Sequence, residues 1–223
     1  MKKIALSALF VAALFTAPAM AQQPAAKKTT PGTAKAAGTA YQIQPQLSTL
    51  GWVGKKVTGE HNGTIQFKEG NVLVRGNQLV GGTFVVDMNS LKVVDLTDAD
   101  SNGKLLGHLK ADDFFGTEKN PTATLKITNI TPIKGAAADA NNATITGDLT
   151  IKGITKPITF PAKVGVKNGL AAATGVATID RTKYDIKYGS KSFFEGIGDK
   201  AIYDEFTLSF NVIAKKGNGV AAN

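Results

Sequence analysis

The chain has 223 residues, a formal net charge of +9 and no cysteine. The lack of cysteine excludes disulfide bonds, lipoprotein attachment through a cysteine, and thiol nucleophiles. Removing the two lysines of residues 1–21 leaves a charge of +7, and three more lysines fall in residues 22–40. The remaining excess of positive charge is spread along the chain, so the composition does not indicate a nucleic-acid partner.

Residues 1–21 have the features of a bacterial secretory signal peptide. Lys2 and Lys3 precede the apolar run Ile4–Phe15, and Ala19-Met20-Ala21 has the small-x-small form of a cleavage site. We predict cleavage after Ala21 and a periplasmic or secreted mature protein. The apolar run is well short of the about 20 residues that a membrane helix needs, so we expect no membrane span.

The composition divides the rest of the chain into a linker, one domain and a tail. Residues 22–40 are rich in Ala, Thr, Lys and Pro and poor in large apolar side chains, which predicts a disordered linker. We assign residues 41–215 to a single domain and residues 216–223 to a flexible C-terminal tail.

From Tyr41 onward, apolar and polar residues alternate with a period of two, which is typical of half-buried strands. Turns that contain Gly or Asn separate the runs. Ten runs show this pattern, and we expect about nine strands from them: 41–46, 50–59, 64–67, 71–75, 78–88, 122–130, 143–151, 158–166, 171–180 and 202–212.

One segment departs from the alternation. Leu105, Leu106 and Leu109 have helical spacing, which predicts a short helix over 103–115. Residues 98–103 resemble the opening of an EF-hand calcium loop, but Leu109 stands where the loop needs a glutamate. We therefore expect these residues to form an Asx-rich turn before the helix.

Strands of this number and length in one domain either stack as a sandwich or close on themselves. Closure removes the exposed strand edges, so the prediction is all-β, a closed antiparallel β-barrel of about eight strands with one short helix between strands. A barrel of this size is either filled by side chains or holds one small ligand. The small residues predicted to face inward fit both outcomes, and these are Gly82, Gly147, Ala162, Ala173, Gly175 and Ala177.

No set of residues predicts catalysis, a cofactor or a metal site. Gly196-Ile-Gly198-Asp-Lys-Ala201 matches a dinucleotide-binding pattern, but a strand follows it where a helix is required. His61 and His108 are the two histidines, and they fall in different elements. A metal-dependent hydrolase would need one of them beside an acid in a cleft.

Several ordered segments resemble the YceI-like family of bacterial secreted proteins. The segments that carry the resemblance are His61–Ile65, Gly81–Met88, His108–Phe115, Asn120–Leu125, Ile145–Pro157 and Ile179–Tyr184. The resemblance implies a lipocalin-like barrel whose hydrophobic tunnel binds a polyisoprenoid or another long-chain lipid, without enzymatic activity. Many members have a His-Ser pair where this chain has Leu47-Ser48.

Alternation within the matching blocks selects the residues expected to line the tunnel. The same alternation would also place them in a core filled by side chains. The candidate ligand-binding residues are Phe84, Val86, Met88, Leu125, Ile127, Leu149, Ile151, Phe160, Phe206 and Phe210.

The leading hypothesis is therefore a periplasmic carrier or storage protein for a long-chain lipid or isoprenoid. Two alternatives stay open: an envelope interaction or stress-response module with a filled interior, and a hydrolase that uses a histidine. The sequence also leaves open whether the protein forms a homodimer.

Overall fold

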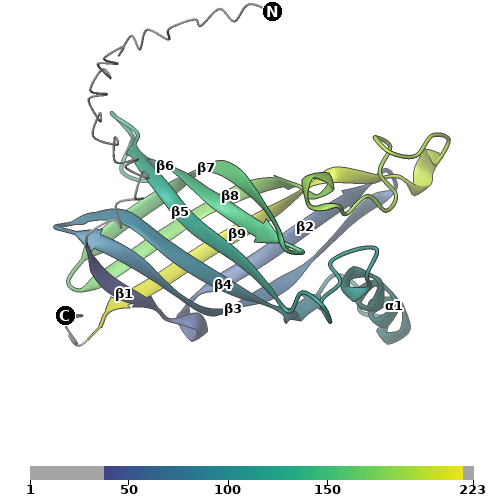
Figure 1. The fold of residues 1–223 in the computed structure, drawn as a ribbon, viewed down its shortest axis with the longest axis horizontal. Coiled ribbons are helices and arrows are strands. Elements are labelled where there is room, and N and C mark those ends of the chain that lie inside the picture. The colour runs from purple at the N-terminus through teal and green to yellow at the C-terminus, as the bar shows by residue number, and fades with distance from the viewer. Residues whose placement is uncertain (1–37, 218–223) are drawn as a thin grey trace, which may run out of the picture. The chain divides into compact units, whose positions relative to one another are not determined.

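The computed structural model describes residues 38–217. The predicted signal peptide, residues 22–37 of the predicted linker and residues 218–223 of the predicted tail lie outside the described residues. Within them, nine strands, one α-helix and three short 3-10 helices follow one another (Figure 1). The elements are β1 (Thr39–Ile43), η1 (Pro45–Leu47), β2 (Thr49–Lys56), β3 (Gly59–Arg75), β4 (Gln78–Val93), α1 (Ala99–Lys110), β5 (Thr122–Pro132), β6 (Ala143–Ile151), β7 (Ile154–Lys167), β8 (Leu170–Asp180), η2 (Arg181–Tyr184), η3 (Gly198–Lys200) and β9 (Ile202–Lys216).

The strands form a closed antiparallel barrel, as predicted. Strands β3 to β9 pair in sequence order, each with the next. The remaining position, between β3 and β9, is shared by β1 and β2, each of which pairs with both neighbours. Nine strand segments therefore fill eight positions, with η1 interrupting the one that is shared.

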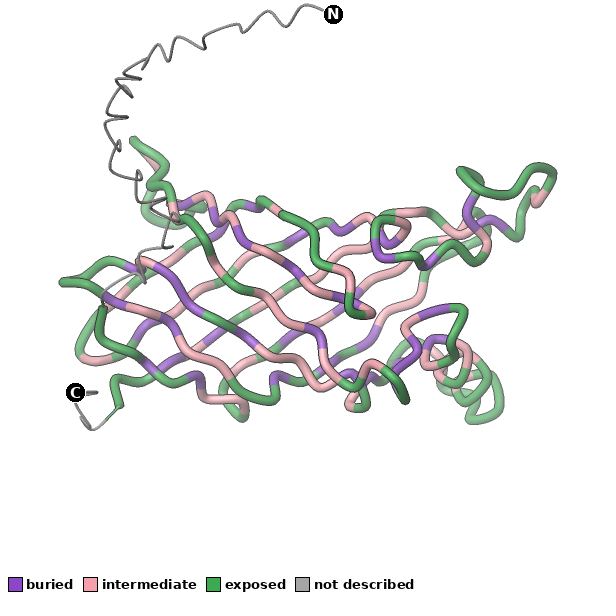
Figure 2. Tube along the Cα trace, viewed as in Figure 1, coloured by how far each residue is buried: buried purple, intermediate pink, exposed green. Residues whose placement is uncertain are grey.

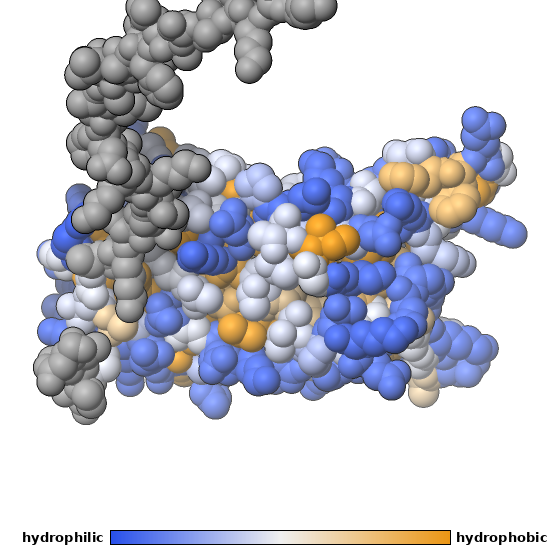
Figure 3. All heavy atoms as spheres, viewed as in Figure 1, coloured by the Kyte–Doolittle hydropathy of each residue, from blue (hydrophilic) through white to orange (hydrophobic). Residues whose placement is uncertain are grey.

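Burial alternates along the strands, so each strand turns one face inward (Figure 2). Strand β6 is the clearest case, with buried residues at every second position from Ala143 to Ile151. The side of the barrel that Figure 3 shows is largely hydrophilic, with scattered apolar residues. This one-sided pattern is what a barrel with an apolar interior requires.

Two sequence expectations were wrong in their boundaries. The runs 64–67 and 71–75 belong to one strand, β3, and a register shift against β4 between Phe67 and Glu69 accommodates the polar residues that separate the runs. The helix runs over Ala99–Lys110 rather than 103–115, because Asp98 caps it by accepting a hydrogen bond from the Ser101 amide at 2.8 Å. Residues 99–103 are thus its first turn instead of a preceding loop.

Arg181, at the start of η2, anchors the connection between β8 and β9. It is 2% exposed, and it donates hydrogen bonds to the carbonyl oxygens of Ile186 (2.8 Å), Ile202 (3.1 Å) and Tyr203 (3.1 Å). The Asp204 carboxylate lies 3.6 Å away. Burial lowers the pKa of the Arg181 guanidinium, and Asp204 opposes this decrease. One buried cation thereby ties both ends of the connection to the barrel.

Replacing Arg181 with methionine should therefore destabilise the protein strongly. The substitution removes three hydrogen bonds and leaves the Asp204 carboxylate without its cation, so we expect the free energy of unfolding to fall by about 3–5 kcal/mol. Urea denaturation measures the change. Lys183→Met, which removes only an exposed ion pair with Asp180, should change it little. Equal losses in both variants would contradict this role for Arg181.

Candidate ligand-binding cavity

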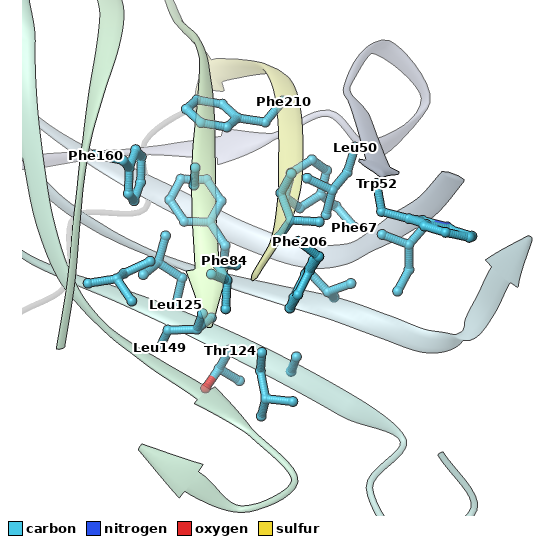
Figure 4. A pocket seen from close by; sticks show the side chains of 18 of the residues that line it. Leu50, Trp52, Phe67, Phe84, Thr124, Leu125, Leu149, Phe160, Phe206 and Phe210 are labelled. Carbon is cyan, nitrogen blue, oxygen red and sulfur yellow. The ribbon is translucent and has the colours of Figure 1, made fainter. Parts of the chain in front are cut away.

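The barrel encloses an apolar cavity of about 200 Å³. Every strand from β2 to β9 contributes to its wall, together with Leu109 of α1 and the Phe114-Phe115 pair that follows this helix. Figure 4 shows aromatic and aliphatic side chains from several strands converging on this space. The cavity is therefore a property of the closed barrel as a whole.

The wall of the cavity consists almost entirely of carbon. The lining residues with polar side-chain atoms are Trp52, Thr124, Arg181, Tyr203 and Glu205. The indole nitrogen of Trp52 donates to the Lys92 carbonyl oxygen at 3.1 Å, so it is already satisfied. A ligand inside the barrel is consequently held by apolar contact and by shape, because directed hydrogen bonds are nearly absent from the wall.

All ten residues selected from the sequence line this cavity: Phe84, Val86, Met88, Leu125, Ile127, Leu149, Ile151, Phe160, Phe206 and Phe210. They come from β4, β5, β6, β7 and β9. Phe160 of β7 and Phe210 of β9 meet edge to face at 5.5 Å between ring centroids, on the inner face of the intervening strand β8. Their contact with a ligand stays a prediction.

Sequence reasoning missed lining residues on β2 and β3 and after α1. Leu50 and Trp52 alternate on β2, and Ile65 and Phe67 alternate on β3, so the period-two pattern that selected the others also marks these. Phe115 carries no such signal, because it lies in a turn, and its ring lies 6.2 Å from that of Phe206. Only the fold places that turn at the barrel.

The small inward residues divide into two groups. Ala162, Ala173 and Ala177 line the cavity and leave space there. Gly175 instead lies beneath an aromatic ring, since a Cβ there would lie 2.7 Å from Phe210 Cζ. A Cβ on Gly147 would similarly lie 2.9 Å from Leu125 Cδ1. Both explanations of the small residues, open space and close packing, thus hold at different positions.

The two ends of the barrel differ. At the end where β1 and β9 meet, the buried side chains of Tyr41, Ile43, Val74 and Ala214 do not line the cavity, so it stops before them. At the other end, the exposed lining residues Tyr203 and Glu205 bring the cavity wall to the surface. We call this second end the mouth.

The β4–β5 connection, which contains α1, and the β8–β9 connection flank the mouth and contact each other. His108 of α1 makes an edge contact with Tyr188 of the β8–β9 connection, with 4.4 Å between ring centroids. It also packs against Phe114 at 5.6 Å. The Phe114 ring in turn lies 5.7 Å from the Arg181 guanidinium. The mouth is thus bordered by an aromatic contact between segments that are distant in sequence.

Each histidine has an acid beside it but lies outside the cavity wall. His61 Nδ1 lies 2.7 Å from Asp95 Oδ2, and His108 Nε2 lies 3.4 Å from Asp113 Oδ2. Burial acts to raise the pKa of Asp95, but hydrogen bonds from Asn62 and His61 outweigh it, so this pKa is lowered. Among residues 38–217, no three His, Asp or Glu side chains are grouped as a metal site would require.

Leu47 and Ser48 also lie outside the cavity wall. Leu47 is exposed at the surface. The Ser48 hydroxyl donates to the Gln44 carbonyl oxygen at 2.8 Å and accepts from the Ile213 amide at 3.1 Å. Its hydrogen bonds join η1 to β9, which is a structural role in the shared strand position.

Sequence comparison finds several bacterial relatives. Protein YceI of Escherichia coli O6:H1 is 33% identical over 105 residues, which cover 47% of this chain and 46% of that protein. A UPF0312 protein of Pseudomonas aeruginosa LESB58 is 44% identical over 57 residues, covering 26% of this chain and 27% of the relative. The matches thus span from about a quarter to about half of these relatives.

Solved structures resemble the fold over a larger part of the chain. BcnA of Burkholderia cenocepacia has a TM-score of 0.59 at 23% identity, covering 78% of this chain and 99% of that one. A polyisoprenoid binding domain from Saccharophagus degradans has a TM-score of 0.55 at 17% identity, covering 80% and 99%. At these identities the likeness shows a shared barrel fold.

The family comparison covers most of the chain that the structure describes. The model of the YceI-like domain matches residues 41–214, which run from β1 to the end region of β9 and include the whole cavity wall. This span agrees with the ordered blocks from His61 to Tyr184. The chain therefore belongs to the YceI-like domain family.

Proposed function

We propose that this protein is a periplasmic carrier or storage protein that encloses a long-chain apolar ligand, such as a polyisoprenoid or another lipid. The observation that carries the proposal is the cavity of about 200 Å³ with a nearly all-carbon wall inside a closed barrel. The name of the Saccharophagus degradans neighbour, a polyisoprenoid binding domain, supports the same class of ligand. We propose no catalytic step.

The physical chemistry of the cavity favours such a ligand. Burying roughly 300 Å² of hydrocarbon chain at about 25 cal/mol per Å² contributes about 7 kcal/mol before the cost of association. Polar or charged ligands would lose their hydration without gaining hydrogen bonds from the wall. An unfilled interior also disfavours the alternative of an interaction module built on a filled barrel.

The volume of the cavity limits what fits inside. It is smaller than the roughly 300–1,000 Å³ that is typical of pockets for drug-sized ligands. A narrow chain therefore suits the space better than a fused ring system, and a long chain has to continue toward the mouth. Chain width and length, more than functional groups, would determine which ligands bind.

Extraction of the purified protein with organic solvent, followed by mass spectrometry, tests the proposal. We expect a long-chain lipid or isoprenoid at near-stoichiometric amount, because an apolar ligand should remain bound through purification in water. In parallel, the delipidated protein should take up an apolar fluorophore and enhance its emission. A protein that yields no lipid and takes up no fluorophore would refute the proposal.

Filling the cavity should abolish binding without removing the fold. Ala173 lines the cavity, and we expect Ala173→Phe to weaken fluorophore binding by roughly tenfold or more, because the ring occupies the ligand's space. The matched control is Thr174→Phe, which adds the same ring at the neighbouring, exposed position of β8. Thermal melts of both variants show whether the barrel is retained. Equal binding in both folded variants would contradict the assignment of the cavity.

The periplasmic location rests on the predicted signal peptide and has its own test. Expression of the full chain in a Gram-negative host, followed by fractionation, should place the protein in the periplasmic fraction. N-terminal sequencing of this material should begin at Gln22. A cytoplasmic protein that retains residues 1–21 would refute both the location and the cleavage site.

A further inference from the structure

Exposed large apolar side chains gather at the mouth. Of the ten such residues in the described chain, Val57, Val94, Tyr188, Phe193, Phe194 and Tyr203 lie at this end. All four exposed aromatic residues are among them, with exposed fractions of 47% for Tyr188, 49% for Phe193 and for Phe194, and 54% for Tyr203. We call these four aromatic residues the mouth patch. Figure 3 shows an apolar group on the projecting β8–β9 connection.

Hydrogen bonds hold the patch in an ordered turn. Ser190 is fully buried, and its carbonyl oxygen accepts from the amides of Phe193 (3.2 Å) and Phe194 (3.0 Å). The Ser192 hydroxyl donates to Asp204 Oδ2 at 2.5 Å, which connects the turn to β9. The two phenyl rings are therefore presented to solvent by a structured backbone, at the cost of exposed apolar surface.

The charges around the patch are nearly balanced. The β8–β9 connection, residues 181–201, carries five basic and three acidic side chains, and Asp180 and Asp204 flank it. Lys187 Nζ lies 5.2 Å from the centre of the Phe193 ring, so the lysine stem borders an exposed aromatic ring. Aromatic rings with adjacent lysines are typical of surfaces that lie at a membrane–water interface. The small net charge favours a partner that is recognised mainly by its apolar boundary.

The patch is continuous with the cavity. Tyr203 belongs to the patch and also lines the cavity, and Tyr188 contacts His108 beside Phe114, another lining residue. A chain that leaves the cavity at this end emerges next to the aromatic rings. A lipid that passes from a bilayer into the barrel would then avoid crossing water, where its exposed chain is unfavourable.

We propose that the mouth patch docks on the surface of a phospholipid bilayer, so that the cavity exchanges its ligand directly with the membrane. This inference rests on the proposed carrier function. Phe193 and Phe194 enter the interfacial layer, and the lysines remain at the level of the head groups. Attraction is mainly hydrophobic, so docking does not require anionic lipid and resists added salt.

Co-sedimentation of the purified protein with phosphatidylcholine vesicles tests this docking. We expect the unchanged protein to pellet with the vesicles, at low and at high salt alike. The double variant Phe193→Ser/Phe194→Ser should lower the partition coefficient by roughly tenfold or more, because it removes two half-exposed rings. Vesicles that also contain phosphatidylglycerol should bind the protein only slightly better.

The matched control is Ile133→Ser/Leu170→Ser, which removes two exposed apolar residues at the opposite end of the barrel. This variant should bind vesicles like the unchanged protein. Absence of vesicle binding, equal losses in both double variants, or binding only to anionic vesicles at low salt would each overturn the proposal. Sedimentation velocity tests whether the mouth patch instead binds a second copy of the chain. If the unchanged protein is a dimer that does not bind vesicles, and the phenylalanine variant is a monomer, the docking proposal is also overturned.

Uptake of the apolar fluorophore in solution, without vesicles, separates the two proposals. The phenylalanine variant should load the fluorophore like the unchanged protein, because neither ring lines the cavity. Loading without vesicle binding would refute docking and leave the carrier function intact. Failure of the unchanged protein to load would refute the carrier function itself.

Discussion

The cavity depends on the closure of a single antiparallel sheet. Strand β3 pairs with β4 on one side and with β1 and β2 on the other, so neither edge of β3 is left unpaired. Closure forces one face of each strand into a common interior, and alternation then decides which side chains meet there. The interior stays partly open because alanines at four wall positions project too little to fill it.

The two ends of the barrel are built on different principles. Buried apolar side chains such as Ile43 and Ala214 pack at one end. At the mouth, by contrast, a buried polar side chain is held by hydrogen bonds: Arg181 donates to three backbone carbonyl oxygens. A buried guanidinium is tolerated only with such partners, so its position also fixes the path of the β8–β9 connection.

Much of the barrel and its wall follows from local pattern, and the remainder does not. Period-two alternation identifies Phe84, Leu149 and Phe210 as inward because a strand offers only two faces. The shared position of β1 and β2 depends on the pairing of both strands with β9 and of β1 with the far part of β3, and no local pattern contains that information. The first turn of α1 has no apolar periodicity, and its start is set by Asp98, which accepts a hydrogen bond from the Ser101 amide.

Residues at the mouth are the hardest to predict for the same reason. Phe115 lies in a turn and Arg181 begins the short helix η2, neither of which has a periodic pattern. Both residues reach the interior only because two connections fold toward the same end. The IDRTKY segment contains the arginine, but its hydrogen bonds to Ile202 and Tyr203 depend on the return of β9. Tertiary placement, rather than residue type, makes these positions part of the site.

The contrast between the apolar wall and the mouth constrains which ligands the proposed binding site would accept. Inside the barrel the wall offers almost no hydrogen-bonding group, so under the proposed function it would distinguish chains by width and length alone. The side chains of Tyr203 and Glu205, which carry polar atoms and are exposed, occur at the mouth end of the wall. An amphiphile therefore has one favourable orientation, with its chain in the interior and its polar end at the mouth, since the reverse would bury a polar group against carbon.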